Sequence, residues 1–319
     1  MPSGTPRARA RSFVSMRRTL VACAVVVLAS GCGSGGSAPA FPTSVHGVSL
    51  SGTPGASASP VPNLDPHGGL SRDPGVLAID LAITRRRLLK AIYAWAPSSL
   101  PSTPAPEDVQ VLALHQQRIY GLLAESPALA SATLANLTGS LAREARANVA
   151  AGAAIRSTVT PTKSGPSFKT GSPDPAAQLR ASYDEAEARF GVAWQVLAAV
   201  NFVETRFGRV RSASYASARG PMQFIRSTWK AYGLGGNVHD PHDAILGAAN
   251  YLAASGAPND YKAALGHYNP SKPYVKAVWL YARQMMRDPR EFLVYYSWQV
   301  FVITTKGVVQ LTGPGASTP

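Results

Sequence analysis

The sequence predicts a mainly α fold with an N-terminal helical region, a second helical domain and a C-terminal β-hairpin-like tail. Apolar residues recur at intervals of three and four through residues 76–154 and 176–290, as they do on the buried faces of helices. Stretches rich in Gly, Ser and Pro separate these regions from each other and from the N-terminus. Residues 291–319 are instead dense in β-branched and aromatic side chains around a Lys306-Gly307 turn, which favours two paired strands.

Residues 1–32 have the features of a signal peptide. Arg17 and Arg18 precede an apolar run over residues 20–29, and small residues then lead to Cys32. The run is shorter than the roughly 20 apolar residues that span a bilayer. Its end resembles a bacterial lipobox, whose cysteine becomes the lipidated first residue of the mature protein. We therefore expect an exported lipoprotein, anchored through Cys32 on the outer face of the cell membrane; a plain secretory signal, giving a secreted protein, is the alternative.

Cysteine content and net charge limit the kinds of partner that the folded part is expected to bind. Both cysteines, Cys23 and Cys32, lie in the leader, so no disulfide is expected in the folded part. The formal charge is +14, and removal of five leader arginines leaves 14 − 5 = +9, which suits an anionic polymer. Export disfavours nucleic acid as that polymer. His239 and His242 have no further His or Cys ligands in a metal-site pattern, so we expect no metal and no cofactor.

The regions before the second domain contain no recognisable catalytic or ligand-binding motif. Residues 33–75 lack periodicity and are rich in Gly, Ser and Pro, which predicts a disordered tether. Residues 76–154 predict three helices, broken near Pro106, with the third helix over residues 127–153. We expect this region to be a spacer or docking domain whose protein partners the sequence does not identify. Residues 155–175 predict a second linker.

The most apolar helix of the second domain begins near Val192 and is expected to end near Gly208. A helix that is apolar on every side is buried inside a domain. This helix places Glu204 at its end, where partial desolvation raises the pKa of a carboxyl group and lets it donate a proton near neutral pH. Glu204 is therefore a candidate general acid. The alternative is an ordinary glutamate that turns outward or pairs with Arg206 or Arg209.

Four short motifs follow one another in residues 176–290. They are Glu204-Thr205-Arg206-Phe207, Gly220-Pro221-Met222-Gln223, Asn250-Tyr251-Leu252 and His267-Tyr268-Asn269. In this order they resemble the motifs of lytic transglycosylases with a lysozyme-like α+β catalytic domain, in which the glutamate is the catalytic residue. The resemblance covers about a third of the chain. Thr205 stands where the family has Ser, Pro221 where Leu is common, Arg226 where Pro is usual and His267 where Ala is usual.

The resemblance also implies a groove that binds the glycan strands of peptidoglycan. Its predicted substrate-binding residues are Ser214, Met222, Gln223, Tyr268 and Asn269. Tyr268 is expected to donate a hydrogen bond to Glu204 and to help set its protonation. Ordinary capping for Ser214 and Gln223, and a core position for Met222, are the alternatives.

The carboxylates of the second domain indicate a mechanism with one acid. Most glycosidases flank the scissile bond with two carboxylates. Here Asp240 and Asp243 are expected to be helix caps, and no other acidic residue is an obvious partner for Glu204. We therefore expect Glu204 to protonate the glycosidic oxygen and then to take the proton of O6 as a 1,6-anhydro ring closes, with the substrate's acetamido group as nucleophile.

Three functions follow from these observations. The first is a peptidoglycan lytic transglycosylase that cleaves the β-1,4 bond between MurNAc and GlcNAc. The second is a hydrolytic muramidase, similar to goose-type lysozyme, which a second carboxylate about 5 to 9 Å from Glu204 would favour. The third is an inactive lipoprotein that binds the cell wall.

Overall fold

The computed structural model describes residues 64–163, 169–214 and 217–316. Over these residues the chain forms eleven helices and a two-stranded antiparallel sheet, which confirms the mainly α prediction. The predicted leader with Cys32 and most of the predicted tether lie outside the described residues. No described helix combines the length and the apolar character that a membrane span requires.

The N-terminal region contains four helices where the sequence predicted three. They are α1 (Pro74–Trp95), α2 (Glu107–Glu125), α3 (Pro127–Ala135) and α4 (Gly139–Arg156). The single third helix predicted over residues 127–153 was wrong, because the chain breaks between α3 and α4. Gly139 there has a φ of 62°, which interrupts the helical backbone and which glycine adopts without steric cost. Leu137 turns into the core at the break, with 7% of its surface exposed.

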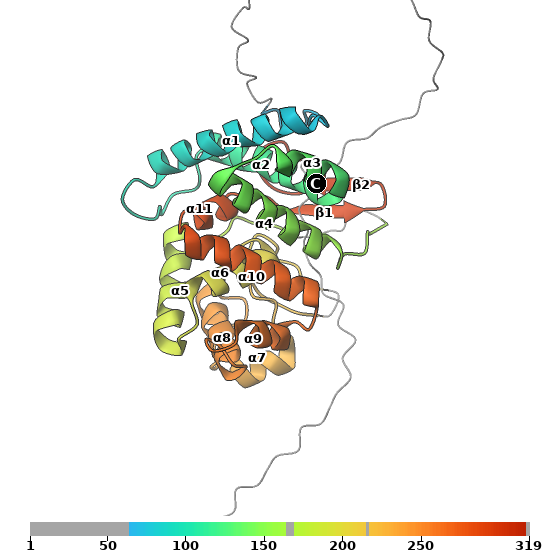
Figure 1. The fold of residues 1–319 in the computed structure, drawn as a ribbon. Coiled ribbons are helices and arrows are strands. Elements are labelled where there is room, and N and C mark those ends of the chain that lie inside the picture. Colours follow the sequence, from blue (N-terminus) through green and yellow to red (C-terminus); the bar gives the residue numbers. More distant parts are fainter. Residues whose placement is uncertain (1–63, 164–168, 215–216, 317–319) are drawn as a thin grey trace, which may run out of the picture.

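The second helical region is built around α6 and α10. Its helices are α5 (Ala176–Phe190), α6 (Trp194–Thr205), α7 (Arg226–Tyr232), α8 (Pro241–Ala254), α9 (Tyr261–Tyr268) and α10 (Lys272–Arg287). Ten of the twelve residues of α6 are buried, as its apolar sequence predicted. Helix α10 packs on both α4 and α6, and Figure 1 shows it between the N-terminal helices above and α7–α9 below.

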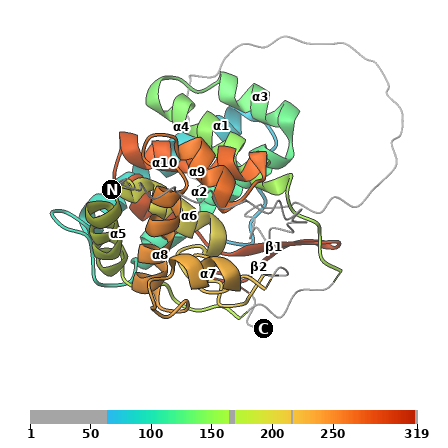
Figure 2. The ribbon, with the colours of Figure 1, turned by 90° about the horizontal axis from the view of Figure 1, so that it is seen from below.

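The tail begins with a helix. Residues Glu291–Tyr296 form α11, and only β1 (Phe301–Thr304) and β2 (Gly307–Gln310) form the predicted hairpin. The prediction that residues 291–296 are strand was wrong because their aromatic side chains also fit a helical spacing. Figure 2 shows the hairpin on the opposite side of the molecule from α5.

The tail packs on both helical regions. From α11, Phe292 lies 5.5 Å from Phe207 and Tyr295 lies 5.1 Å from Phe202, measured between ring centroids. The Tyr295 hydroxyl also donates to the Asn148 side chain in α4 at 2.9 Å. One continuous buried apolar cluster therefore includes residues from α1, α2, α4, α6, α10 and α11.

Candidate active site

Helix α6 carries Glu204 at its last turn, and the backbone reverses sharply after it. The helix ends at Thr205, three residues before the predicted stop at Gly208. Arg206, Phe207 and Gly208 all have positive φ, at 54°, 59° and 83°. For the two non-glycine residues this conformation costs about 1–3 kcal/mol each, so surrounding contacts must hold it in place. Phe207 makes such contacts: it is 1% exposed, and its ring packs against Phe202 of α6 and Phe292 of α11.

The hydroxyl group of Thr205 ties the end of α6 to the turn formed by residues 220–223. It donates to the Pro221 carbonyl at 2.6 Å and accepts from the Gly208 amide at 2.9 Å. The family resemblance has Ser at this position, and Thr keeps the hydroxyl that makes both bonds. The residue next to Glu204 is thus fixed to the second motif of the predicted groove.

That turn admits only glycine at position 220. Gly220 has a φ of 74°, and a Cβ there would lie 1.7 Å from the Val238 carbonyl oxygen. Gln223 has a φ of 50° and donates from its side-chain amide to the Gly220 carbonyl at 2.9 Å. Met222 is fully buried. Gln223 therefore stabilises its own turn and does not cap α7, which begins at Arg226 without a side-chain cap. The Met222 side chain belongs to the core, which is the alternative that the sequence left open for it. Sugar contacts by these residues remain predictions.

The tyrosine that bonds Glu204 is Tyr274. Its hydroxyl donates to Glu204 Oε1 at 2.6 Å. Tyr268 instead donates its one hydroxyl proton to the Met222 carbonyl at 2.7 Å, so the predicted bond from Tyr268 to Glu204 was wrong. Both tyrosines lie near the Glu204 carboxyl group. Burial is the larger cause of the raised pKa of each tyrosine, and the negative charge of Glu204 raises it further.

Tyr274 is positioned by the start of α10. Ser271 caps this helix by accepting from the Tyr274 amide at 3.4 Å, and a proline stands in its first turn. Asn269 accepts from the Ser271 amide at 3.1 Å and is 7% exposed. The sequence named Tyr274 only as an aromatic that could stack on a sugar. In the sequence, Ser271 and the proline directly before Tyr274 indicated a helix start, and a helix start fixes the position of Tyr274.

The remaining predicted residue, Ser214, lies in the loop before the turn. Its hydroxyl accepts from the Ala218 amide at 3.1 Å, and its own amide donates to the Ala218 carbonyl at 3.0 Å. Two hydrogen bonds thus join Ser214 to Ala218. Its contact with substrate remains a prediction.

The environment of Glu204 suits proton transfer near neutral pH. Glu204 is half-buried, and burial raises the pKa of its carboxyl group to about 7, while the Tyr274 hydrogen bond acts in the opposite direction. Within the described residues, neither cause of this pKa shift is a neighbouring carboxylate. The sequence left open an ion pair between Glu204 and Arg206 or Arg209. In the structure Arg206 donates to the Phe202 carbonyl, and Arg209 donates to the Arg206 carbonyl.

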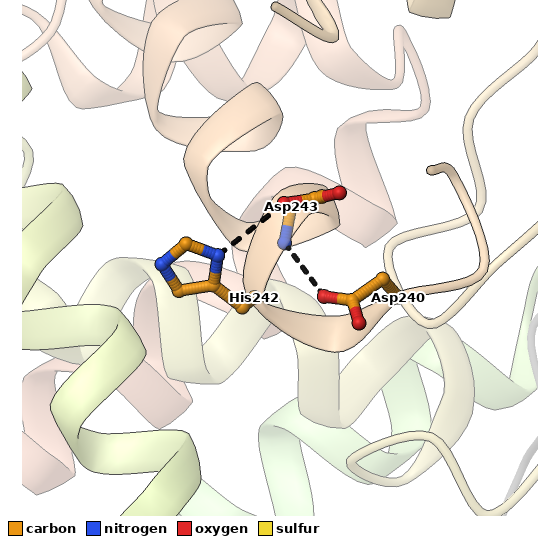
Figure 3. A group of neighbouring side chains, drawn as sticks. All are labelled: Asp240, His242 and Asp243. Carbon is orange, nitrogen blue, oxygen red and sulfur yellow. Dashed lines mark hydrogen bonds and ion pairs between the residues drawn. The ribbon is translucent and has the colours of Figure 1, made fainter. Parts of the chain in front are cut away.

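A group with metal-binding side chains lies at the start of α8. The ligand atoms of Asp240, His242 and Asp243 lie within 4.8 Å of one another (Figure 3). Asp240 accepts from the Asp243 amide at 3.1 Å, which confirms it as the cap of α8. Asp243 accepts from the Asn237 amide at 2.8 Å. These carboxylates stabilise the helix start and the loop before it, which accounts for the group without a metal ion.

Comparison with protein families identifies this part of the chain. Residues 182–278 match the family model of the transglycosylase SLT domain. The matched region contains Glu204, the turn at residues 220–223, Tyr268 and Tyr274. No curated protein and no solved structure matches the chain. The domain supports a function on peptidoglycan of the lytic transglycosylase or lysozyme-like kind.

Proposed function

We propose that the protein is a peptidoglycan lytic transglycosylase in which Glu204 acts first as general acid and then as general base. It would cleave the β-1,4 bond between MurNAc and GlcNAc and leave a 1,6-anhydromuramoyl end. The observation that carries this proposal is the half-buried Glu204 carboxyl group, with a pKa of about 7 and a hydrogen bond from Tyr274, inside the matched SLT domain.

The reaction needs both protonation states of Glu204. With a pKa of about 7, about half of the molecules carry the protonated form at neutral pH. Protonated Glu204 donates to the glycosidic oxygen as the bond from that oxygen to C1 breaks, and the acetamido carbonyl oxygen of the same sugar bonds to C1. The Glu204 carboxylate then takes the O6 proton as O6 attacks C1 and displaces the acetamido oxygen. Tyr274 stabilises the carboxylate between the two steps.

The masses of the products test the reaction. Purified peptidoglycan is digested with the protein, and the fragments are analysed by mass spectrometry. We expect ends that are lighter than hydrolytic ends by one water, because O6 of the sugar replaces the water nucleophile. Glu204→Gln protein, treated in parallel, identifies fragments that other activities produce. Reducing ends alone would contradict the transglycosylase proposal and favour the muramidase.

We also propose that the protein is exported and held at the outer face of the cell membrane by lipid on Cys32. The proposal rests on the basic and apolar leader that ends at this cysteine. Replacement Cys32→Ser should move the protein from the membrane fraction to the soluble extracellular fraction. Unchanged fractionation of this variant would contradict the anchor.

A further inference from the structure

Helix α1 has two opposite faces, and only one of them is covered by the rest of the described chain. Its buried side chains, among them Leu77, Leu81 and Leu88, pack into the continuous apolar cluster. Because an α-helix turns by about 100° per residue, the least covered positions fall on the opposite side. We call them the outer face of α1, and they are Val76, Ile79, Ile83, Arg86, Arg87, Lys90 and Tyr93.

The first half of the outer face is apolar. Val76 and Ile79 are 45% and 48% exposed, and the half-buried Ile83 follows them one turn later. Single exposed apolar side chains are ordinary on a protein surface. These three side chains instead share one face of one helix, which is typical of a surface that binds a partner.

The second half of the outer face is basic. Arg86, Arg87 and Lys90 are exposed, and within the described residues none of them makes an ion pair. The only acid of α1 is Asp80, which contacts His115 Nε2 at 2.9 Å and is therefore already engaged. A solvated helix face usually carries charges of both signs, whereas cations beside apolar residues are typical of a helix that lies on a membrane.

A lipid surface with anionic head groups would satisfy both halves of the outer face. Lysine and arginine are attracted to the head groups, while valine and isoleucine side chains enter the boundary with the acyl chains. A soluble anionic polymer would pair with the cations and leave the apolar side chains in water. A second copy of the chain would bring further cations to a face that contains no acid to pair with them.

We propose that the outer face of α1 binds the surface of a membrane that contains anionic lipid, with the helix axis parallel to that surface. The face runs for about 26 Å from Val76 to Tyr93, so it contacts several head groups at once. Tyr93 is 53% exposed at its end, and tyrosine is enriched where membranes meet water. The proposal depends neither on the reaction at Glu204 nor on lipid at Cys32.

The place of α1 in the molecule supports this orientation. The 31 residues 33–63 of the predicted tether separate Cys32 from the first described residue. A flexible chain of that length spans about 30 Å on average, so an anchor at Cys32 would keep α1 near the membrane. Figure 1 shows α1 along the upper edge of the molecule and α7–α9 at the lower edge. A membrane at α1 therefore leaves the side with α9 and Tyr268 free for glycan strands.

Co-sedimentation with lipid vesicles tests the proposed surface. The mature chain without lipid, residues 33–319, keeps every described residue and lacks the apolar leader, which would itself bind vesicles. We expect it to bind mixed phosphatidylglycerol and phosphatidylcholine vesicles at least tenfold more tightly than phosphatidylcholine vesicles. Salt at about 0.5 M should weaken this binding. No binding, or equal binding to both kinds of vesicle, would overturn the proposal.

Charge variants show whether the outer face makes this contact. Simultaneous replacement of Arg86, Arg87 and Lys90 by glutamine should weaken binding to the anionic vesicles at least tenfold, because these cations lie nearest the head groups. The control removes the same charge from exposed lysines on α7, α9 and α10 and should weaken binding by less than threefold. Its three positions are Lys230, Lys262 and Lys276. Equal losses in the two variants would show that net charge alone drives the binding and would overturn the proposal.

A single thiol shows whether the apolar half enters the lipid. Both cysteines lie in the leader, so Ile79→Cys gives the 33–319 chain its only thiol. An environment-sensitive fluorophore on this thiol should emit at shorter wavelength when phosphatidylglycerol vesicles are added. The same label on Val309→Cys, at a position 37% exposed in β2, should not change. No shift for Ile79→Cys, or binding of soluble polyglutamate as tight as that of the vesicles, would contradict a membrane as the partner.

Discussion

Two hydroxyl groups hold Glu204 and the helix end that carries it. Tyr274 donates to the carboxylate itself, and Thr205 binds the end of α6 to the Pro221 carbonyl. The sequence predicted the acid, because an apolar helix that ends in a glutamate implies a desolvated carboxyl group. The family resemblance pointed to Tyr268 as the tyrosine that bonds this group, and that prediction was wrong. Tyr268 and Tyr274 are six residues apart on different helices, and only the crossing of α9 and α10 decides between them.

Removal of the Tyr274 hydroxyl should shift the pH dependence of activity. The acid step needs protonated Glu204, so kcat/KM should fall as pH rises through the Glu204 pKa of about 7. The hydrogen bond lowers this pKa, hence Tyr274→Phe should raise it and move the fall to higher pH. Initial rates measured across this pH range check the shift. Tyr268→Phe is the matched control, since its hydroxyl bonds Met222 and the shift should be smaller; a shift of the Tyr274→Phe profile to lower pH would contradict the assignment.

At the scale of elements, α11 supports the turn that follows Glu204. Phe292 lies at 5.5 Å from Phe207 and 5.9 Å from Trp194, between ring centroids. The sequence predicted the hairpin of the tail, but it extended the strands too far. Aromatic and β-branched residues fit the period of a strand and that of a helix over so few residues, and only the surface they cover distinguishes the two.

Truncation of Phe292 should therefore destabilise the fold. Phe292 is fully buried, and a change of Phe to Ala in a core costs about 3–5 kcal/mol. Urea denaturation of Phe292→Ala measures this loss. Val309→Ala, at a position 37% exposed in β2, should change stability by less than about 0.5 kcal/mol. Equal effects of the two changes would show that α11 does not hold the core as described.

At the scale of the molecule, the N-terminal helices and the SLT domain share one core. One buried apolar cluster includes residues of both regions, and α10 packs on α4. The tail adds a polar connection, because the Gln117 side chain in α2 donates to the Gln299 carbonyl at 2.9 Å and accepts from the Gln299 amide at 2.8 Å. The sequence predicted the helices from the spacing of their apolar residues and the linker between the two regions from its composition. It predicted a spacer or docking domain because an amphipathic pattern shows that a face is buried and does not show which neighbour buries it.

The shared core predicts how fragments behave. Residues 64–316 should fold as a unit and unfold in one transition that is the same by fluorescence and circular dichroism. Residues 182–278 alone would lack the second half of α10 and leave the α6 surface uncovered, and we expect this fragment to aggregate or to remain unfolded. A stable, cooperative 182–278 fragment would contradict this account.

The measurement that tests the central claim most directly is peptidoglycan turnover by Glu204→Gln. The account predicts a loss of about 10²–10⁴-fold or more, with binding to insoluble peptidoglycan retained, because the amide keeps the shape of the side chain and cannot transfer the proton. Glu185→Gln, which changes an exposed glutamate bonded to His242, should keep full turnover. Turnover by Glu204→Gln within tenfold of the unmodified protein would show that Glu204 is not the proton carrier.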